Sequence, residues 1–273
     1  MTTIVHISDF HFGTEIPEIT AALVPDVIAQ NPTLVAFSGD QTQRALKGQY
    51  EQARAYMASL PKPSVSIPGN HDFPMYNPLA RALRPLSGYR KYISEDTEPS
   101  YIDSNIALVS IDTSRHYFWK DGTVSRSQLE RMKNSFAGVP PTACRIVMMH
   151  HPCFVPPEFP VHNQVGNADA ALAAMSQARV ELVLAGHMHD AFVRLTDPEP
   201  PHRPVHLILS QAGTAISSRR RSQPNSYNVV HVDEAEISIV VRMWNGTAFA
   251  DGETRRFARH WKSAPTLTSA TST

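Results

Sequence analysis

The chain has 273 residues, of which 42% are hydrophobic and 18% are charged, the composition of a globular protein that can bury a sizeable core. Lysine plus arginine equals aspartate plus glutamate, at 25 each, so no net charge recruits nucleic acid or an anionic membrane. No apolar stretch is long enough for a membrane span, and the N-terminal segment lacks the pattern of a signal peptide. We therefore expect a cytoplasmic location, no membrane span and no stable nucleic-acid partner.

Along the chain, short apolar runs alternate with helix-like stretches, the pattern of βαβ units. We interpret five of these runs as buried strands, at residues 4–8, 34–38, 64–67, 145–149 and 182–185. Helices are predicted for residues 17–30 and 48–60. In the second of them, apolar residues recur at the spacing of one buried helix face.

Beyond residue 70 the pattern is looser. Residues 74–88 predict a short helix among prolines and arginines, and residues 101–111 predict a hairpin that turns at residues 103–105. A helix is expected for residues 125–136, with Ser125 as its cap. The proline-rich residues 152–160 are too stiff for a helix and are expected to form the rim of a site.

The last third of the chain changes character. Short strands are predicted at residues 191–195, 205–209, 227–232 and 237–243, which indicates an antiparallel second half. Residues 263–273 are small and hydroxylated, and we expect a disordered tail there. Cys144 and Cys153 lack the spacing of a zinc motif, so we expect two reduced, structural thiols.

Polar motifs follow each of the five buried strands. These motifs are Asp9-Phe10-His11, Gly39-Asp40, Gly69-Asn70-His71-Asp72, His150-His151-Pro152 and Gly186-His187-Met188-His189. Ligands of open α/β sheets gather at the C-terminal edge of the strands, so these side chains are expected to meet there. Carboxylates, imidazoles and one amide, without any thiolate, suit metals such as Mn, Fe, Ni or Zn.

Five ordered pieces of this kind resemble the calcineurin-like metallophosphoesterase superfamily, whose pattern reads D-x-H, G-D, G-N-H-[DE], H and G-H-x-H. The resemblance covers roughly residues 4–243. It implies a four-layer α/β/β/α sandwich with mixed sheets. We expect one such domain over residues 1–262.

The resemblance also implies two divalent or trivalent metal ions, which could be Mn, Fe, Zn, Ni or Co. One metal would be held by Asp9, His11, Asp40 and His189, and the other by Asp40, Asn70, His150 and His187. Asp40 would then bridge the two through its two oxygens, and a metal-bridging hydroxide would attack phosphorus directly. His151 is the alternative to His150, because neighbouring side chains alternate in direction and only one of the pair can face the metals.

Two further residues are given catalytic tasks by the same resemblance. His71 would protonate the departing alkoxide or stabilise the phosphoryl oxygens, and Asp72 would orient the imidazole of His71 through a hydrogen bond. Glycines in the motifs would let the main chain approach the metals closely.

Other candidate residues remain open. The cluster Arg219-Arg220-Arg221 is either a solvated loop or a site for a substrate phosphate, and Tyr117 and Trp119 either pack or stack on a substrate. The remaining histidines match no motif and are interpreted as core or surface residues: His6, His116, His162, His202, His206, His231 and His260. Among these, His162 could face the site because it lies in the loop that follows His150.

Differences between this sequence and the motifs of other members of the family narrow the range of expected substrates. The segment after Asp40 lacks both the extended motif of protein phosphatases and the tyrosine ligand of purple acid phosphatases. The remaining resemblance is to class III cyclic nucleotide phosphodiesterases and related bacterial enzymes. It implies hydrolysis of small-molecule phosphodiesters, with 3',5'-cyclic nucleotides as the first substrates to test.

Two alternatives stay open. A phospholipid or lipid-precursor phosphoesterase would use the apolar rim at residues 154–159 and the arginine cluster. A non-catalytic, metal-stabilised binding scaffold would have no use for His71 and Asp72 beside the metals. A homodimer is possible through the hydrophobic residues 117–119.

Overall fold

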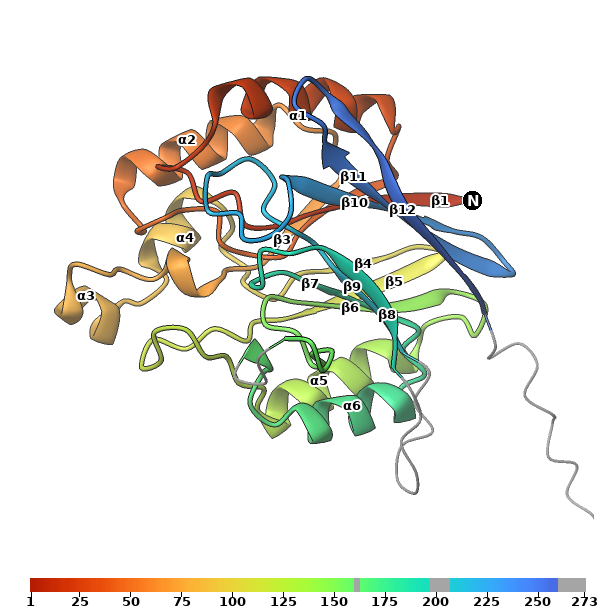
Figure 1. Cartoon of the computed structure of the whole chain (residues 1–273). Helices are drawn as coiled ribbons and strands as arrows, with labels where there is room; N and C mark the ends of the chain where they lie inside the picture. The colour runs from red at the N-terminus through yellow and green to blue at the C-terminus, as the bar shows by residue number, and fades with distance from the viewer. Residues whose placement is uncertain (160–162, 197–206, 260–273) are drawn as a thin grey trace, which may run out of the picture.

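Two six-stranded sheets face each other at the centre of the molecule (Figure 1). The computed structural model describes residues 1–159, 163–196 and 207–259. The first sheet has the order β12-β11-β10-β1-β2-β3, and its strands are β1 (Thr2–Ile7), β2 (Leu34–Phe37), β3 (Ser64–Ser66), β10 (Ser226–Val232), β11 (Glu236–Trp244) and β12 (Phe249–Ala258). Strands β1 to β3 run parallel and β10 to β12 antiparallel, so this sheet is mixed.

The second sheet is also mixed. Its order is β4-β5-β6-β7-β9-β8, and its strands are β4 (Ser100–Ile102), β5 (Ile106–Ile111), β6 (Cys144–Met149), β7 (Leu182–Ala185), β8 (Phe192–Leu195) and β9 (Ile208–Gln211). The four inner strands run parallel, and the edge strands β4 and β8 are antiparallel to their neighbours.

Helices cover the outer face of each sheet. Helices α1 (Pro17–Ala29) and α2 (Lys47–Ala58) pack on the first sheet, and α5 (Arg126–Ala137) and α6 (Ala168–Gln177) pack on the second (Figure 1). A separate apolar cluster, which includes Ile4, Leu34 and Ile146, fills the space between the sheets. The predicted four-layer α/β/β/α sandwich with mixed sheets is therefore confirmed.

Local sequence signals account for several boundaries. The Ser125 hydroxyl accepts a hydrogen bond from the Gln128 backbone N–H at 3.2 Å and caps α5, as predicted. The predicted hairpin forms because the Asp103 carboxylate accepts the backbone N–H groups of Asn105 and Ile106 at the turn. Both cysteines are buried and free.

The sequence-based expectations for the less regular parts of the chain were met only in part. The short helix expected within residues 74–88 is α3 (Pro78–Leu83), whereas η1 (Asn70–Asp72), before this range, and α4 (Ser87–Tyr92), which begins at its end, were not predicted. The second half is not uniformly antiparallel, because β9 pairs parallel with β7. Strand β12 was not predicted, since its charged, exposed residues lack an apolar pattern.

Some predictions fall on residues that the structure does not describe. The expected tail at 263–273, the first residues of the strand predicted at 205–209, and His162, His202, His206 and His260 lie outside the described ranges. The single domain over residues 1–262 stays a prediction. None of the helices within the described ranges combines the length and apolarity that crossing a bilayer requires.

Candidate metal centre

The motif residues converge from both sheets at one end of the molecule. Asp9 and His11 follow β1, Asp40 follows β2, and Asn70 follows β3, all in the first sheet. The second sheet contributes three histidines, of which His150 follows β6 while His187 and His189 follow β7. These are the C-terminal ends of parallel strands, which is where the sequence predicted a site.

The backbone at several of these residues is in the left-handed region. In the described chain, positive φ angles outside glycine occur at nine residues, and five of these are predicted ligands: Asp9, His11, Asp40, His187 and His189. Such conformations cost about 1 to 3 kcal/mol each and persist only where the surrounding structure enforces them. Their concentration at one point supports a functional site there.

A first group of donor atoms comes from Asp9, His11, Asp40 and His189. The Nε2 atoms of His11 and His189 lie 3.2 Å apart, and Asp9 Oδ1 lies 3.4 Å and 3.2 Å from them, respectively. Asp40 Oδ2 lies 3.5 Å from His11 Nε2. One donor atom from each of the four residues thus lies within 4.8 Å of the other three.

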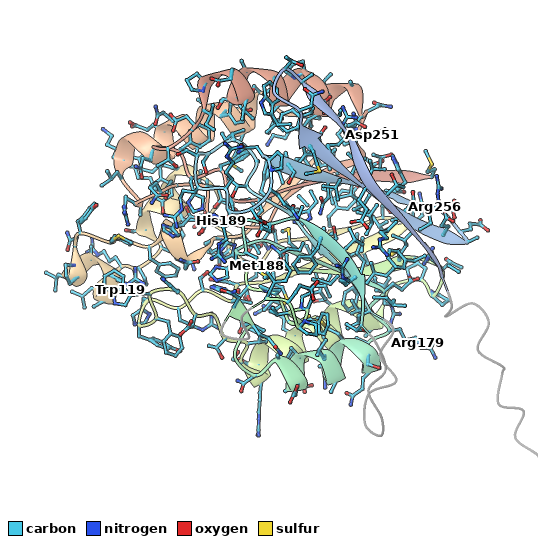
Figure 2. All side chains as sticks on the ribbon, in the orientation of Figure 1. Trp119, Arg179, Met188, His189, Asp251 and Arg256 are labelled. Atoms are coloured by element: carbon cyan, nitrogen blue, oxygen red, sulfur yellow. The ribbon has the colours of Figure 1, made fainter. Side chains whose placement is uncertain are left out.

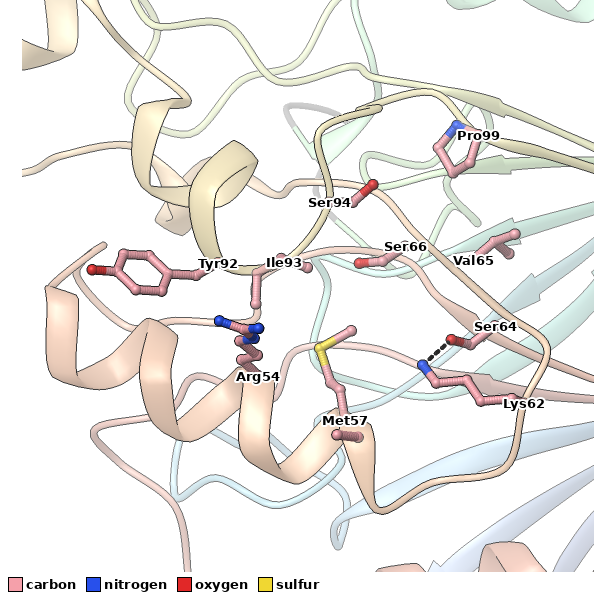
Figure 3. Close-up of a pocket in the computed structure, with 11 residues that line it drawn as sticks. Arg54, Met57, Lys62, Ser64, Val65, Ser66, Tyr92, Ile93, Ser94 and Pro99 are labelled. Atoms are coloured by element: carbon pink, nitrogen blue, oxygen red, sulfur yellow. Dashed lines mark hydrogen bonds between the residues drawn. The ribbon is translucent and has the colours of Figure 1, made fainter.

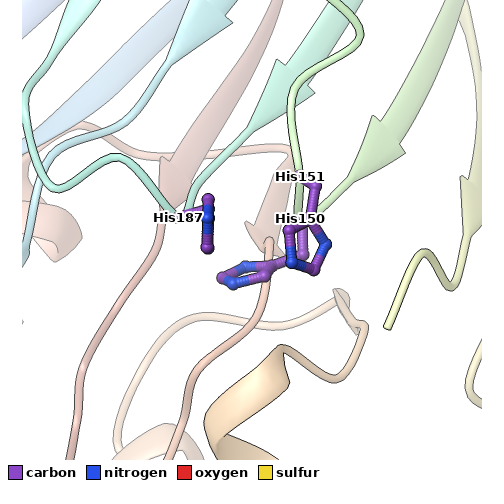
Figure 4. A group of neighbouring side chains, drawn as sticks. All are labelled: His150, His151 and His187. Atoms are coloured by element: carbon purple, nitrogen blue, oxygen red, sulfur yellow. The ribbon is translucent and has the colours of Figure 1, made fainter. Parts of the chain in front are cut away.

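A second group comes from Asn70, His150 and His187. Asn70 Oδ1 lies 3.2 Å from His150 Nε2 and 3.2 Å from His187 Nδ1. His151 is also near, and Figure 4 shows the three imidazoles close together. The two nitrogens of His151 are already engaged, however, since Nδ1 pairs with the Thr113 hydroxyl at 2.8 Å and Nε2 with the Lys120 carbonyl at 2.7 Å. The contacts therefore favour His150 over His151 as the ligand.

Asp40 lies between the two groups. Its Oδ2 atom is 3.5 Å from His11 Nε2 and 3.5 Å from His150 Nε2, so one oxygen faces both. Its other oxygen, Oδ1, accepts the backbone N–H of His71 at 2.8 Å. That Asp40 bridges two metals stays a prediction, and in the structure it is Oδ2 that faces both groups of donors.

Hydrogen bonds at the far side of each ring orient the histidines. His150 Nδ1 donates to the Ser38 carbonyl at 2.8 Å, and His189 Nδ1 donates to the Arg219 carbonyl at 2.6 Å. A carbonyl can only accept, so in the neutral ring Nδ1 carries the proton and Nε2 keeps its lone pair. Those lone pairs face the donor groups, which is the arrangement found in histidines that bind metal.

The donor set fits two metal ions. Donors about 2.1 Å from a metal lie about 3.0 to 3.4 Å from one another in octahedral or tetrahedral sites. The separations of 3.2 to 3.5 Å found here are close to that range. In addition, Asp9 Oδ1 is buried without a hydrogen-bond partner among the described residues, while Asp9 Oδ2 accepts the His187 backbone N–H at 3.0 Å. A buried carboxylate oxygen in that state calls for a cation.

Burial and the neighbouring carboxylates shift the pKa values of the histidines in the donor groups. Burial lowers the pKa of His11 to about 4 in spite of the neighbouring carboxylates. Burial opposes protonation of His150 as well, but the charge of Asp40 raises the pKa of His150 to about 9. Without metal, a proton on His150 balances Asp40, and a bound cation would take over that task.

His71 lies beside the donor groups, but Asp72 does not orient it. His71 Nδ1 donates to the Gln43 carbonyl at 2.9 Å. The Asp72 carboxylate instead accepts the backbone N–H groups of Gln41, Thr42 and Gly69, at 3.2, 2.9 and 3.0 Å. The expected hydrogen bond from Asp72 to the imidazole was therefore wrong, because this carboxylate fixes the loop after β2 against the loop after β3.

A cavity of about 110 Å³ opens onto the donor groups. It is lined by Asp40, Asn70, His71, Lys120, Asp121, Asn163, His187, His189, Arg219 and Arg221. Sequence reasoning named the arginines as open candidates but missed Lys120, Asp121 and Asn163. The only available signal for Asn163 was its place beside His162, in the loop after His150.

A larger cavity, of about 290 Å³, lies near α2 and α4 (Figure 3). Its lining includes Arg54, Met57 and Tyr92, and Lys62 donates to the Ser64 hydroxyl at 2.6 Å. The residues that line it include no carboxylate and no imidazole. It therefore lacks the donors of a metal centre.

The proline-rich loop after β6 packs against the core, whereas the loop after β5 contacts a proposed ligand. Phe154 and Phe159 pack against the core of the second sheet, and Phe159 stacks on Phe192 with ring centroids 5.2 Å apart. The apolar rim proposed for a lipid substrate is thus largely turned into the core. The loop that contains Trp119 does reach the site. Trp119 lies farther from the middle of the molecule than His189 (Figure 2), but the Trp119 carbonyl accepts a hydrogen bond from Asn70 Nδ2 at 3.3 Å.

Comparisons with known proteins agree with this geometry. The sequence profile described as calcineurin-like phosphoesterase matches residues 2–191. A probable cyclic nucleotide phosphodiesterase from Synechococcus is 27% identical over 187 residues, which are 64% of this chain and 64% of that protein. The 3',5'-cyclic adenosine monophosphate phosphodiesterase CpdA from Escherichia coli K12 is 29% identical over 163 residues, which are 57% of this chain and 54% of that protein. The matches thus span only about half to two thirds of these relatives.

A solved structure shares the fold. The purple acid phosphatase PPD1 from yellow lupin seeds superposes with a TM-score of 0.71 at 14% identity, over 98% of this chain and 57% of that chain. At this identity the similarity concerns the architecture alone.

Proposed function

Because the chain belongs to the calcineurin-like phosphoesterase family, we propose that it is a metal-dependent hydrolase of small phosphodiesters. The observation that carries this proposal is the position of Asp40 Oδ2, 3.5 Å from a nitrogen donor in each of the two ligand groups. One shared carboxylate oxygen between two groups of donors suits a pair of neighbouring cations, the arrangement that phosphoester hydrolysis uses.

The proposed ligands form two sets. One metal would be held by Asp9, His11, Asp40 and His189, and the other by Asp40, Asn70, His150 and His187. Metals bound there lower the pKa of water toward neutrality and offset the charge of the phosphoryl group. Mixed oxygen and nitrogen donors accept Mn, Fe, Zn, Ni or Co, and availability selects among them.

His71 is the proposed catalytic residue of the chain itself. Its Nδ1–H is held by the Gln43 carbonyl, so a neutral ring presents a lone pair at Nε2. Burial lowers the pKa of His71, and the negative charge of Asp40 opposes that change. An anionic substrate beside the ring would favour the imidazolium form, which can donate from Nε2 to a phosphoryl oxygen or to the departing alkoxide. Asp72 would act indirectly, by fixing the main chain from Gly69 to His71.

The first substrate to test is a 3',5'-cyclic nucleotide. Two relatives carry names of cyclic nucleotide phosphodiesterases, and this is the support for that choice. A cytoplasmic location and a homodimer, both predicted from the sequence, accompany the proposal. Cell fractionation and light scattering test them.

A substrate panel tests the activity. The protein is loaded with Mn and assayed with cyclic AMP, bis(p-nitrophenyl) phosphate and p-nitrophenyl phosphate. We expect turnover of the two diesters to exceed turnover of the monoester. Monoester turnover far above diester turnover would reverse the choice of diesters, and a metal-loaded protein that is inert toward every phosphoester would favour the binding scaffold.

A further inference from the structure

Three cationic side chains line the cavity of the metal centre. Lys120 comes from the loop after β5, and Arg219 and Arg221 come from the segment between β9 and β10. None of the three forms an ion pair with a carboxylate among the described residues. The cavity lining contains only two carboxylates, Asp40, which faces the metals, and Asp121. The wall beyond the metals is thus rich in unpaired positive charge.

A buried amide in the same wall lacks an acceptor. Asn163 is only 5% exposed and lines the cavity, and its Nδ2 group has no hydrogen-bond partner in the described chain. Leaving such a buried donor unpaired destabilises the folded protein. Because Asn163 lines the cavity, a ligand whose oxygen atoms enter the cavity brings hydrogen-bond acceptors near this side chain.

The backbone holds part of this wall close to the metal ligands. The Arg219 carbonyl accepts the Nδ1–H of His189 at 2.6 Å, so the main chain at Arg219 is fixed to a ligand. On the other side, the Lys120 carbonyl accepts a hydrogen bond from His151 Nε2 at 2.7 Å. The cationic side chains therefore start from fixed points on two sides of the cavity.

The amount of positive charge exceeds what one phosphodiester requires. Two divalent cations, the carboxylates of Asp9 and Asp40 and a bridging hydroxide together have a net charge of about +1, which already balances the single negative charge of a phosphodiester. Three additional cations and a free amide donor point to a second anionic group on the substrate.

We propose that Lys120, Arg219, Arg221 and Asn163 form a subsite for a second phosphate group of the substrate, beside the phosphodiester that is cleaved. This inference rests on the proposed function and narrows its substrate class to phosphodiesters that carry an additional phosphate. Cyclic AMP, which has a single phosphate, is then expected to be a poorer substrate than a phosphodiester of this class. The subsite binds the second phosphate, and the metals and His71 face the first.

A matched pair of substrates tests the subsite. Thymidine 5'-(p-nitrophenyl phosphate) and its 3'-phosphorylated counterpart differ only by the second phosphate. For the Mn-loaded protein we expect kcat/KM to be about tenfold higher for the 3'-phosphorylated compound, mainly through KM, since several partly exposed ion pairs each contribute a small gain in binding. Lys120→Gln and Arg221→Gln should each reduce that ratio, and the double variant should bring it near one.

Arg220→Gln is the matched control. Arg220 belongs to the same arginine run but does not line the cavity, so its variant should keep the wild-type ratio. A wild-type ratio near one, or an equal loss of the ratio in the Arg220 variant, would overturn the subsite.

Binding provides a readout that does not depend on turnover. Calorimetry on the Mn-loaded protein should show that thymidine 3',5'-bisphosphate binds about tenfold more tightly than thymidine 5'-monophosphate, and that the Lys120→Gln/Arg221→Gln double variant loses the difference. Equal affinities in the wild-type protein would contradict the subsite. If neither nitrophenyl ester is cleaved but the difference in binding persists, the proposed hydrolysis fails while the subsite stands.

Discussion

At the scale of single residues, the polar side chains of the candidate metal centre each use one atom to bind the main chain and another to face the proposed metals. Asp9 and Asp40 each give one oxygen to a backbone N–H and turn the other toward the donor groups. His150 and His189 give Nδ1 to a carbonyl and turn Nε2 inward. Because the main chain fixes each side chain, we expect loss of a proposed ligand to reduce metal binding, and loss of a residue that only faces the substrate to reduce turnover.

Substitution of Asp40 and of His71 should separate metal binding from chemistry. Asp40→Ala removes the oxygen shared by both donor groups, so we expect metal and activity to be lost together. His71→Ala should keep two metals per chain and lower kcat by a factor of about 10² to 10⁴. Elemental analysis beside kinetics measures both, with the exposed His116→Ala as the control. Two metals retained in the Asp40 variant would contradict the shared ligand.

A glycine that touches Asp40 provides a steric test of the same site. A Cβ atom at Gly69 would overlap the Asp40 carboxylate, so Gly69→Ala should displace that side chain and lower metal content. The matched control is Gly48→Ala in α2, where a Cβ meets no atom within 4 Å. We expect the control to bind metal normally and to gain up to about 1 kcal/mol in helix stability. Equal metal content in the two variants would show that the loop after β3 can move enough to accommodate the added Cβ without displacing Asp40.

At the scale of elements, the sequence predicted the strands and helices that have a strong apolar periodicity and the site residues that lie in ordered motifs. Strand β7 was found at its expected bounds because it is a short, wholly buried apolar run. Strand β12 was missed since an edge strand exposes charge, and the direction of β9 was missed because pairing depends on distant neighbours. The proposed ligands could be named from the motifs, whereas Lys120 and Asn163 reach the cavity through loop conformations that leave no local pattern.

Helix α3 and the loop after β5 form one supporting unit. Arg81 of α3 is 7% exposed and donates to the carbonyls of His116 and Phe118 at 2.7 and 2.6 Å. Its guanidinium also lies 4.6 Å from the centre of the Trp119 ring. The Trp119 carbonyl in turn holds Asn70, so the helix supports a predicted metal ligand through the loop.

Arg81→Met should loosen that support. Methionine keeps much of the length of arginine but removes the donors, so we expect faster amide exchange in residues 113–121 and metal binding weakened by about tenfold. Exchange mass spectrometry and metal titration measure the two effects. Arg84→Met, at an exposed arginine of the same segment, is the control and should change neither. Unchanged exchange in the Arg81 variant would show that the loop is held by other contacts.

At the scale of the whole molecule, the centre joins the two sheets. Asp9, Asp40 and Asn70 come from the first sheet, and His150, His187 and His189 come from the second. Apolar packing fills the space between the sheets, but at this edge the facing groups are polar and buried. Metals that bind residues of both sheets would bind the folded chain far better than the unfolded one, so they should stabilise it.

Removal of the metals should therefore lower the thermal stability of the entire chain. At free metal concentrations about 100 times Kd, binding stabilises the fold by about 2.7 kcal/mol. For a domain of this size that corresponds to a fall in Tm of about 5 °C on chelation. Calorimetry with and without EDTA measures the shift, and Asp40→Ala, which lacks the shared ligand, should show little response. A protein with two metals by elemental analysis whose Tm does not respond to EDTA would mean that the centre contributes chemistry without joining the sheets.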